Sequence, residues 1–421
     1  MPNIKPFNAV YYNIKKVKDM AKVVSPPYDV ISAEEQDNLH NLSPYNFTRI
    51  DFAKDFPGDT KTENKYTRAK TVYSDWLRRN VMVQDEKPCI YFYRQDYKIM
   101  GQKHSRMGFI SLLGLENEED SRVFPHENTH DHAVDDRFRI CESLKSNLSC
   151  IFVCYSDRQL KIEKIFEKHV VATPPLVNVM DNDRVQHKLW RLDDANMINE
   201  IRKSVDGQQL FIADGHHRYK VALEYRKKRL ARVTNPTGLE PFNYVMTYFT
   251  NMDSRGLQIF PMHRVVRQFP KKTDFLEEYF RIDNIKKKED LPILLARAGR
   301  NEHAFGLYTA EGIKLLRLKN RKLVDEYIAE GSSEYKNLDA TILKSFVFDR
   351  VGVQTDDIIY TKDIDRVMHL VDFQQADAGF ILNPVKISQL RAIALNGERM
   401  PPKTTYFYPK VLSGLTVYKM D

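Results

Sequence analysis

One stretch decides the predicted fold, and it reads Leu210-Phe211-Ile212-Ala213-Asp214-Gly215-His216-His217-Arg218. Its first four residues form a short, continuous apolar run, which is typical of a buried strand. The residues from about His217 to Leu230 favour a helix. Because the first N–H groups of a helix point outward and carry partial positive charge, an anion binds readily at such a helix start. The stretch therefore predicts a strand-to-helix turn that holds an anion.

The residue types in this turn suit phosphate oxygens. Gly215 lets a ligand approach the backbone closely, and His216, His217 and Arg218 supply hydrogen-bond donors. Asp214 is a candidate catalytic residue and a candidate ligand for Mg²⁺, which prefers carboxylate and phosphate oxygens. The structural alternative is that Asp214 caps the helix and that the polar residues after it are solvated.

A second motif lies in the polar stretch 116–136 and reads Pro125-His126-Glu127. A glutamate beside a phosphate site can take the proton from an attacking hydroxyl, and such a general base typically contributes about 10²–10⁴-fold. Glu127 is therefore a candidate general base, with His126 as a second candidate catalytic residue. The alternative is a surface loop in which Glu127 is merely solvated.

The same residues also fit a zinc motif, His126-Glu127-Asn128-Thr129-His130. This HExxH pattern binds zinc when a helix places both histidines on one face, with the glutamate as base. The acids that could supply a third ligand are Glu116, Glu118, Glu119, Asp120 and Asp131. The polar surroundings are unfavourable for the buried helix that this motif needs.

A third stretch, at 400–410, is polar and aromatic without periodicity and is predicted to be irregular. Lys403, Thr404 and Lys410 in this stretch are candidate ligands for an anion. The alternative is a packed loop whose aromatic residues serve as anchors.

The chain has 421 residues, which is too long for one ordinary core and suggests two or three domains. We expect an α/β region at 1–100, a core at 101–235 and an α+β region at 236–421. Apolar spacing predicts helices over 65–79 and 138–147. Ser32 followed by Glu35 predicts a helix start.

Composition restricts the class of protein. The formal charge of +8 favours anionic ligands, but acids are interleaved with bases, as in 271–290, so we expect no nucleic acid as partner. No run approaches the roughly 18 apolar residues of a membrane span, and the N-terminal sequence is not that of a secretory signal. Four cysteines without a CxxC pair predict buried free thiols and a cytoplasmic location. The oligomeric state stays open.

Known kinase motifs are missing. The sequence has no GxxxxGK[ST] loop and no GxGxxG followed by VAIK, so another scaffold is needed. The residues from Asp214 to Arg218, after their short apolar strand, resemble the signature of the ParB/sulfiredoxin-like superfamily. Archaeal free serine kinases of that superfamily carry a PHE motif upstream, which 125–127 matches.

Across nearly the whole chain, the sequence also resembles a bacterial-type family of pyrophosphate-dependent L-serine kinases, long catalogued as a domain of unknown function. The matching segments are 26–31, 44–47, 125–127, 213–219, 251–253, 399–401 and 406–410. The resemblance implies a ParB/sulfiredoxin-like core in which Glu127 is the general base and 214–218 bind the phosphate donor. It also implies Mg²⁺ as cofactor, pyrophosphate as donor and free L-serine as acceptor. The product, O-phospho-L-serine, would feed cysteine synthesis.

One departure and several alternatives remain. Asn128 stands where the family pattern HEKT has lysine, so it cannot supply that charge to a phosphate. The ligand of the serine carboxylate is left open between Arg137, Lys145 and Arg264, and His263 is a further candidate substrate-binding residue. The alternatives to a pyrophosphate-dependent kinase are an ADP- or ATP-dependent serine kinase and a non-catalytic ParB-like protein that binds nucleic acid or nucleotide. A sulfiredoxin-like reductase would need a cysteine where the turn has histidine.

Overall fold

The computed structural model describes residues 3–117 and 121–421. The chain separates by its contacts into two compact units, each described here by itself. Unit 1 comprises Met1–Pro125, Thr129–Leu257 and Pro409–Asp421, and unit 2 comprises His126–Asn128 and Gln258–Tyr408. The predicted division near residues 100 and 235 stays a prediction.

Unit 1 is built on a large mixed sheet with the strand order β6-β11-β8-β12-β5-β4-β10-β9, and β1 also pairs with β5. β11 lies antiparallel to β8 and parallel to β6. The strands of unit 1 are β1 (Ile4–Lys5), β2 (Val10–Tyr12), β3 (Met82–Gln84), β4 (Ile90–Ile99), β5 (Gln102–Gly114), β6 (Val123–Phe124), β7 (Ser146–Asn147), β8 (Ile151–Tyr155), β9 (Val177–Met180), β10 (Gln186–Leu192), β11 (Leu210–Asp214), β12 (Tyr244–Asn251) and β21 (Tyr418–Lys419).

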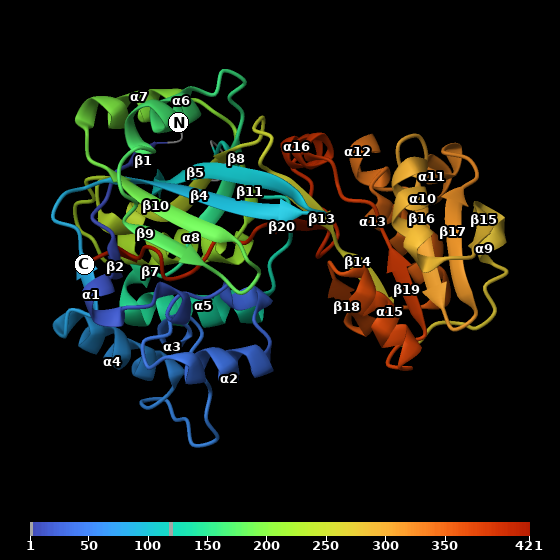
Figure 1. The fold of residues 1–421 in the computed structure, drawn as a ribbon, viewed down its shortest axis with the longest axis horizontal. Helices are drawn as coiled ribbons and strands as arrows, with labels where there is room; N and C mark the ends of the chain where they lie inside the picture. Colours follow the sequence, from blue (N-terminus) through green and yellow to red (C-terminus); the bar gives the residue numbers. More distant parts are fainter. Residues whose placement is uncertain (1–2, 118–120) are drawn as a thin grey trace. The chain divides into compact units, whose positions relative to one another are not determined.

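Helices cover both faces of this sheet (Figure 1). α6 and α7 pack on one face, where Ile162 and Ile201 join Phe92 and Phe109 in a single apolar core. On the other face the strands present the buried polar side chains Gln95 and Arg106, which hold the C-terminal segment by hydrogen bonds. The helices of unit 1 are α1 (Ile14–Val17), α2 (Ala33–Leu42), α3 (Thr48–Asp51), α4 (Lys65–Arg78), α5 (Asp131–Leu144), α6 (Lys161–Ile165), α7 (Ala195–Val205) and α8 (His216–Leu230).

Unit 2 is a second α/β body around an antiparallel sheet with the order β15-β17-β16-β19-β14-β18. Successive residues of a strand point to opposite faces, so Val265 joins the core beneath α10 and α15 while Val266 joins the core on the other face. The elements are β13 (Gln258–Pro261), β14 (His263–Val266), β15 (Phe280–Ile285), β16 (Ala304–Thr309), β17 (Gly312–Leu318), β18 (Ile358–Thr361), β19 (Ala378–Ile381), β20 (Thr405–Tyr408), α9 (Leu276–Tyr279), α10 (Leu291–Ala298), α11 (Lys322–Tyr327), α12 (Ser333–Lys336), α13 (Asp339–Leu343), α14 (Asp349–Val351), α15 (Ile364–Asp372) and α16 (Ile387–Leu395).

Several predictions from local pattern are confirmed. The fold is of the mixed α/β class, the helix at 65–79 is α4, and Ser32 caps α2 by accepting from the Glu35 N–H at 3.1 Å. All four cysteines are free and buried, and burial raises the pKa of Cys141, Cys150 and Cys154 to about 12. In the described part of the chain, no helix has both the length and the apolar character that crossing a bilayer requires.

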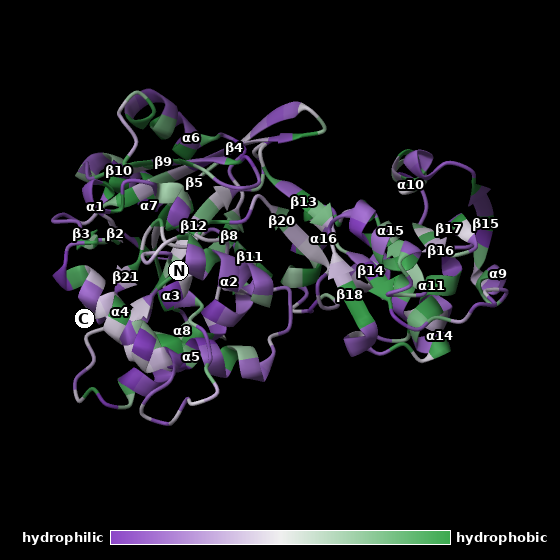
Figure 2. Ribbon diagram, turned by 60° about the horizontal axis from the view of Figure 1, so that its bottom comes forward, coloured by the Kyte–Doolittle hydropathy of each residue, from purple (hydrophilic) through white to green (hydrophobic). Residues whose placement is uncertain are grey.

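Two local predictions are wrong. The helix expected at 138–147 begins at Asp131 and ends at Leu144, because Val134, Ile140 and Leu144 form a buried stripe at helical spacing along α5. Hydrophilic and hydrophobic residues alternate along this helix in Figure 2. The stretch expected to be irregular contains strand β20, whose Thr, Tyr and Phe residues favour a pleated surface and pair with β13.

Candidate functional site

The strand-to-helix turn at 214–218 forms as predicted. β11 ends at Asp214, α8 begins at His216, and Gly215 between them has a φ of +87°, in the left-handed region that glycine favours. A Cβ atom on Gly215 would lie 3.0 Å from Arg218 Nε. The N-cap residue of α8 is Gly215, which has no side chain and so provides no side-chain cap. We refer to 214–218 as the Asp214 turn.

Two cations surround the Asp214 carboxylate. Lys410 Nζ lies 2.6 Å from Asp214 Oδ2, and an Arg218 guanidinium nitrogen lies 3.6 Å from Oδ1. The side chains of Asp214, Arg218 and Lys410 are only 12%, 12% and 16% exposed. Burial opposes ionisation of Asp214, but Lys410 and Arg218 outweigh it and hold the pKa of this carboxyl well below its usual range. Asp214 is therefore an ionised partner of two cations. The structural alternative, in which Asp214 caps α8, is wrong, because the N-cap residue is Gly215.

This arrangement does not fit a resident Mg²⁺ ion on Asp214. A divalent ion there would have to displace the Lys410 ammonium, which already occupies one carboxylate oxygen. Within the described residues, no group of three or more His, Cys, Asp or Glu side chains is placed to hold a metal ion.

The remaining residues of the turn have defined partners. Arg218 donates to the Cys150 carbonyl, while its buried Nε has no hydrogen-bond partner in the described chain. Burial opposes the charge of Arg218, but Asp214 outweighs it and raises the pKa of the guanidinium. His217 Nε2 accepts from the His130 backbone N–H at 3.0 Å, and the two rings stack with centroids 5.9 Å apart. His216 is buried.

The PHE loop, Pro125-His126-Glu127, is held by contacts with 400–405. The His126 carbonyl accepts from the Met400 N–H at 2.8 Å, and Glu127 and Met400 form a parallel bridge. Thr405 Oγ1 donates to Glu127 Oε1 at 3.5 Å and lies 3.2 Å from His126 Nε2. The His126 side chain is fully buried, whereas that of Glu127 is 23% exposed. A buried histidine and a partly exposed carboxylate therefore share one threonine hydroxyl.

The zinc interpretation of 126–130 is wrong, because the helix that it needs does not form. His130 is extended, with φ −94° and ψ 129°, and α5 starts only at Asp131. Proline at 125 disfavours helical backbone before it, and the bridge to Met400 holds Glu127 in extended structure. His126 and His130 therefore do not share a helix face. Glu118, Glu119 and Asp120, named as possible third ligands, lie outside the described residues.

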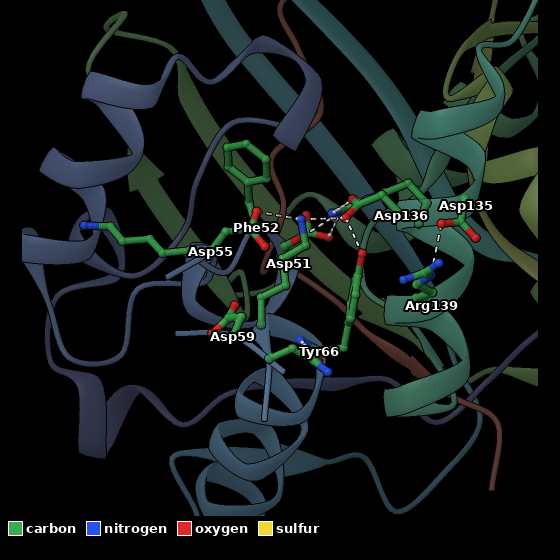
Figure 3. Close-up of polar contacts among 12 residues, drawn as sticks. Asp51, Phe52, Asp55, Asp59, Tyr66, Asp135, Asp136 and Arg139 are labelled. Carbon is green, nitrogen blue, oxygen red and sulfur yellow. Dashed lines mark hydrogen bonds and ion pairs between the residues drawn. The ribbon is translucent and has the colours of Figure 1, made fainter. Parts of the chain in front are cut away.

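Arg137 already has carboxylate partners. It is buried in α5, donates to the Asp51 carbonyl and to Asp136 Oδ2 at 2.5 Å each, and stacks over the Tyr28 ring at 4.1 Å. Tyr66 donates to Asp136 at 2.9 Å, and Figure 3 shows Asp51, Asp136 and Tyr66 within this one network. These contacts tie α5 to α3 and α4 and give Arg137 a structural role.

The other predicted ligands are dispersed. Lys145 lies 3.8 Å from Asp421 on the surface. Lys403 and Thr404 belong to unit 2, where Lys403 is exposed and Thr404 donates to the Pro401 carbonyl at 2.5 Å. The Asp214 turn belongs to unit 1.

His263 and Arg264 lie on β14 of unit 2, and both are buried. His263 Nδ1 accepts from the Leu382 N–H at 3.2 Å, and burial together with Arg264 lowers the pKa of His263 to about 4. Arg264 donates to the Met262 carbonyl at 2.5 Å and lies over the Tyr360 ring. No carboxylate of the described chain forms a salt bridge with Arg264, and burial lowers its pKa to about 10.

Sequence reasoning missed the residues that bring Lys410 to the turn. Gln95 donates to the Lys410 carbonyl at 2.8 Å, and Arg106 donates to the Pro409 carbonyl. Arg106 also donates from Nε to Gln95 Oε1 at 3.0 Å. Both residues lie in the polar parts of their strands, beside Arg94 and Asp96 in β4 and Ser105 in β5, so the sequence does not distinguish them from their solvent-facing neighbours.

Comparison with solved structures finds low-identity likenesses. A free serine kinase in complex with AMP is 13% identical over 68% of this chain and 83% of that chain, with a TM-score of 0.35. SbnI from Staphylococcus aureus, truncated at its C-terminus, is 11% identical over 72% and 85%, with a TM-score of 0.36. A conserved hypothetical protein from Pyrococcus furiosus is 12% identical over 70% and 92%, with a TM-score of 0.33.

No curated protein matches the sequence. One family matches residues 4–341, well over half of the chain, and its description is "Protein of unknown function (DUF1015)". The chain therefore belongs to the DUF1015 family.

Proposed function

We propose that this protein is a kinase that transfers a phosphoryl group from inorganic pyrophosphate to the hydroxyl of free L-serine. The observation that carries the proposal is the Asp214 turn, where a helix start with a glycine N-cap lies beside Arg218 and Lys410. Two cations, Arg218 and Lys410, lie against the Asp214 carboxylate, and both can contact a small and highly charged anion. The choice of pyrophosphate and serine follows the motif resemblance at 125–127 and 213–219.

The donor's phosphates bind at the start of α8. The helix dipole and the N–H groups of its first turn attract the anion, and Arg218 adds charge-assisted hydrogen bonds. The site is mostly buried, so these interactions are less screened than in water. Phosphoryl transfer depends mainly on such positioning and electrostatic stabilisation.

Glu127 acts as the general base. It accepts the proton of the serine hydroxyl as that oxygen attacks the transferred phosphorus, and the second phosphate of pyrophosphate leaves as orthophosphate. The partial exposure of Glu127 allows contact with a substrate, and Thr405 orients its carboxylate. Only Asn128 and Thr129 separate Glu127 from His130, whose N–H donates to His217 of the turn.

Arg264 is the preferred ligand for the serine carboxylate among the three that the sequence left open. Arg137 and Lys145 form ion pairs with acidic side chains, whereas Arg264 is a buried guanidinium on which Asp339 acts electrostatically without an ion pair within 4.0 Å in the described residues. A guanidinium binds a carboxylate through two parallel hydrogen bonds. Pairing with serine would therefore neutralise this buried charge.

The test is formation of O-phospho-L-serine, measured by mass spectrometry with purified protein, L-serine and MgCl₂. Pyrophosphate, ADP and ATP are supplied in separate reactions. We expect product with pyrophosphate, and turnover in Glu127→Gln reduced by about 10²–10⁴-fold. The matched control is Glu200→Gln, an exposed glutamate on α7, which should keep full activity.

Each outcome has a definite meaning. If phosphoserine forms only with ADP or ATP, the protein is a serine kinase whose phosphate donor is a nucleotide and not pyrophosphate. Absence of product in every reaction would refute the serine kinase. Donor binding without turnover would then favour a non-catalytic binding protein.

A further inference from the structure

The C-terminal segment Pro409–Asp421 belongs to unit 1 and delivers one lysine to the Asp214 turn. Lys410 Nζ lies 2.6 Å from Asp214 Oδ2, although 196 positions separate the two residues in the sequence. Arg218 approaches the other oxygen of the same carboxylate at 3.6 Å. The three side chains form a mostly buried group in which two cations face one carboxylate, and Asp29 and Asp51 also act electrostatically on Arg218.

The backbone around Lys410 is fixed from the sheet. Gln95 on β4 donates to the Lys410 carbonyl at 2.8 Å, and Arg106 on β5 donates to the preceding carbonyl of Pro409. Both strand residues are fully buried, and the Leu412 N–H points to the Tyr93 hydroxyl at 3.5 Å. Further along, Ser413 and Val417 bridge to Ser25 and Val10. Lys410 therefore extends from a rigid support, unlike a typical surface lysine.

We propose that Lys410 is an anion-binding residue of the Asp214 turn, and that Asp214 holds its ammonium in position for a phosphate oxygen. A lysine ammonium has three N–H donors, so it can contact Asp214 and an anion at the same time. The ligand class is a compact anion with several phosphate oxygens, bound between Lys410, Arg218 and the start of α8. This inference rests on the proposed function and names a residue of its donor site.

The alternative is a purely structural ion pair. Such a pair would fasten the C-terminal segment to β11 and would contribute nothing to ligand binding. The segment is already held by Gln95, Arg106 and the bridges at Ser413 and Val417, so the charge of Lys410 is not needed to place it. Burying three charges also costs desolvation free energy, which an incoming anion would partly repay.

The experiment is calorimetric titration of the full chain with sodium pyrophosphate at constant ionic strength. We expect Lys410→Met to weaken binding about 10- to 100-fold, the range of one charge-assisted hydrogen bond, and Lys410→Arg to stay within a few-fold of wild type. The matched control is Lys419→Met, in the same segment, where the lysine pairs with Asp421 at 3.2 Å and should not affect binding. Melting curves establish that each variant is folded.

A second measurement avoids substitution. Reductive methylation of the wild-type protein, read by mass spectrometry, should show that pyrophosphate protects Lys410 and leaves the labelling of Lys419 unchanged. Unaltered affinity in Lys410→Met, equal labelling with and without pyrophosphate, or no pyrophosphate binding by the wild type would each overturn the inference. Weakened binding in Lys410→Met without phosphoserine formation would support Lys410 and refute only the kinase. Phosphoserine formation together with unaltered pyrophosphate affinity in Lys410→Met would support the kinase and refute the role of Lys410.

Discussion

Replacing Gly215 with alanine tests the geometry of the Asp214 turn. Gly215 has a φ of +87°, and an L-residue in the left-handed region costs about 1–2 kcal/mol. The added Cβ would lie 3.0 Å from Arg218 Nε and 3.1 Å from its Cζ, so the guanidinium must move away. That movement would loosen the contacts of Arg218 with the Cys150 carbonyl and with Asp214. Gly215→Ala should therefore lose both stability and anion binding.

The two effects separate through a matched control. Gly238 has a φ of +80° but no atom within 4 Å of its added Cβ, so Gly238→Ala carries the backbone cost alone. At about 2–4 °C per kcal/mol, each variant should melt about 2–8 °C below wild type. Calorimetric titration with pyrophosphate should show binding weakened at least about 10-fold in Gly215→Ala, the loss expected for one charge-assisted hydrogen bond, and unchanged in Gly238→Ala. Equal pyrophosphate affinity in both variants would refute the role assigned to Gly215.

Three further predictions concern charge. Burial opposes ionisation of Asp136, but Arg137 and Lys65 lower its pKa to about 2, so its stabilising contribution is complete above about pH 4 and is lost as the pH falls toward 2. The difference in free energy of unfolding between wild type and Asp136→Asn, measured with urea, should therefore disappear over that range. A difference that stays constant with pH would contradict the ion pair. Burial and Arg264 lower the pKa of His263 to about 4, below its unfolded value of about 6.5. As the pH falls, the unfolded state therefore binds the proton first, and the free energy of unfolding should decrease between pH 6.5 and 4. His263→Gln should weaken this pH dependence, and an unchanged slope would contradict the role of His263. Lys410 already pairs with Asp214, so adding about 10 mM Mg²⁺ alone to EDTA-dialysed protein should leave the melting temperature unchanged. Only an ion that binds the folded state raises the melting temperature. A clear rise would therefore indicate a resident metal.

Local pattern predicts the elements of this protein well. The apolar run at 210–213 followed by Asp-Gly gives β11 and the start of α8, and the helical spacing of Ala69, Tyr73 and Trp76 gives α4. In both cases the signal lies within about fifteen residues, and tertiary packing agrees with it. The prediction at 138–147 missed the true start of α5 because its first turns are polar on the outside, so only every third or fourth residue reveals the helix.

The partners of charged residues could not be predicted in the same way. In the sequence, Arg137 and Arg264 are candidate ligands of the serine carboxylate and Lys410 is a candidate anion ligand, and nothing local shows which of them already has an acidic partner. The fold distinguishes them, because Arg137 pairs with Asp51 and Asp136 and Lys410 pairs with Asp214, whereas Arg264 forms no salt bridge with a carboxylate of the described chain. These pairings depend on strand order and on the return of the C-terminal segment, neither of which has a local signature.

The electrostatics of the Asp214 turn illustrate why that return matters. Without Lys410, the charge of Arg218 would be offset by Asp214, and Asp29 and Asp51 also act on it, so the partial charge of the helix dipole would be the main attraction for an anion. With Lys410 fixed by Gln95 and Arg106, the same turn gains a second cation in a mostly buried setting. A residue from the far end of the chain thus changes a common helix start into a site with net attraction for a multiply charged anion. The affinity of the turn for phosphate should therefore depend on the C-terminal segment as much as on the 214–218 motif itself.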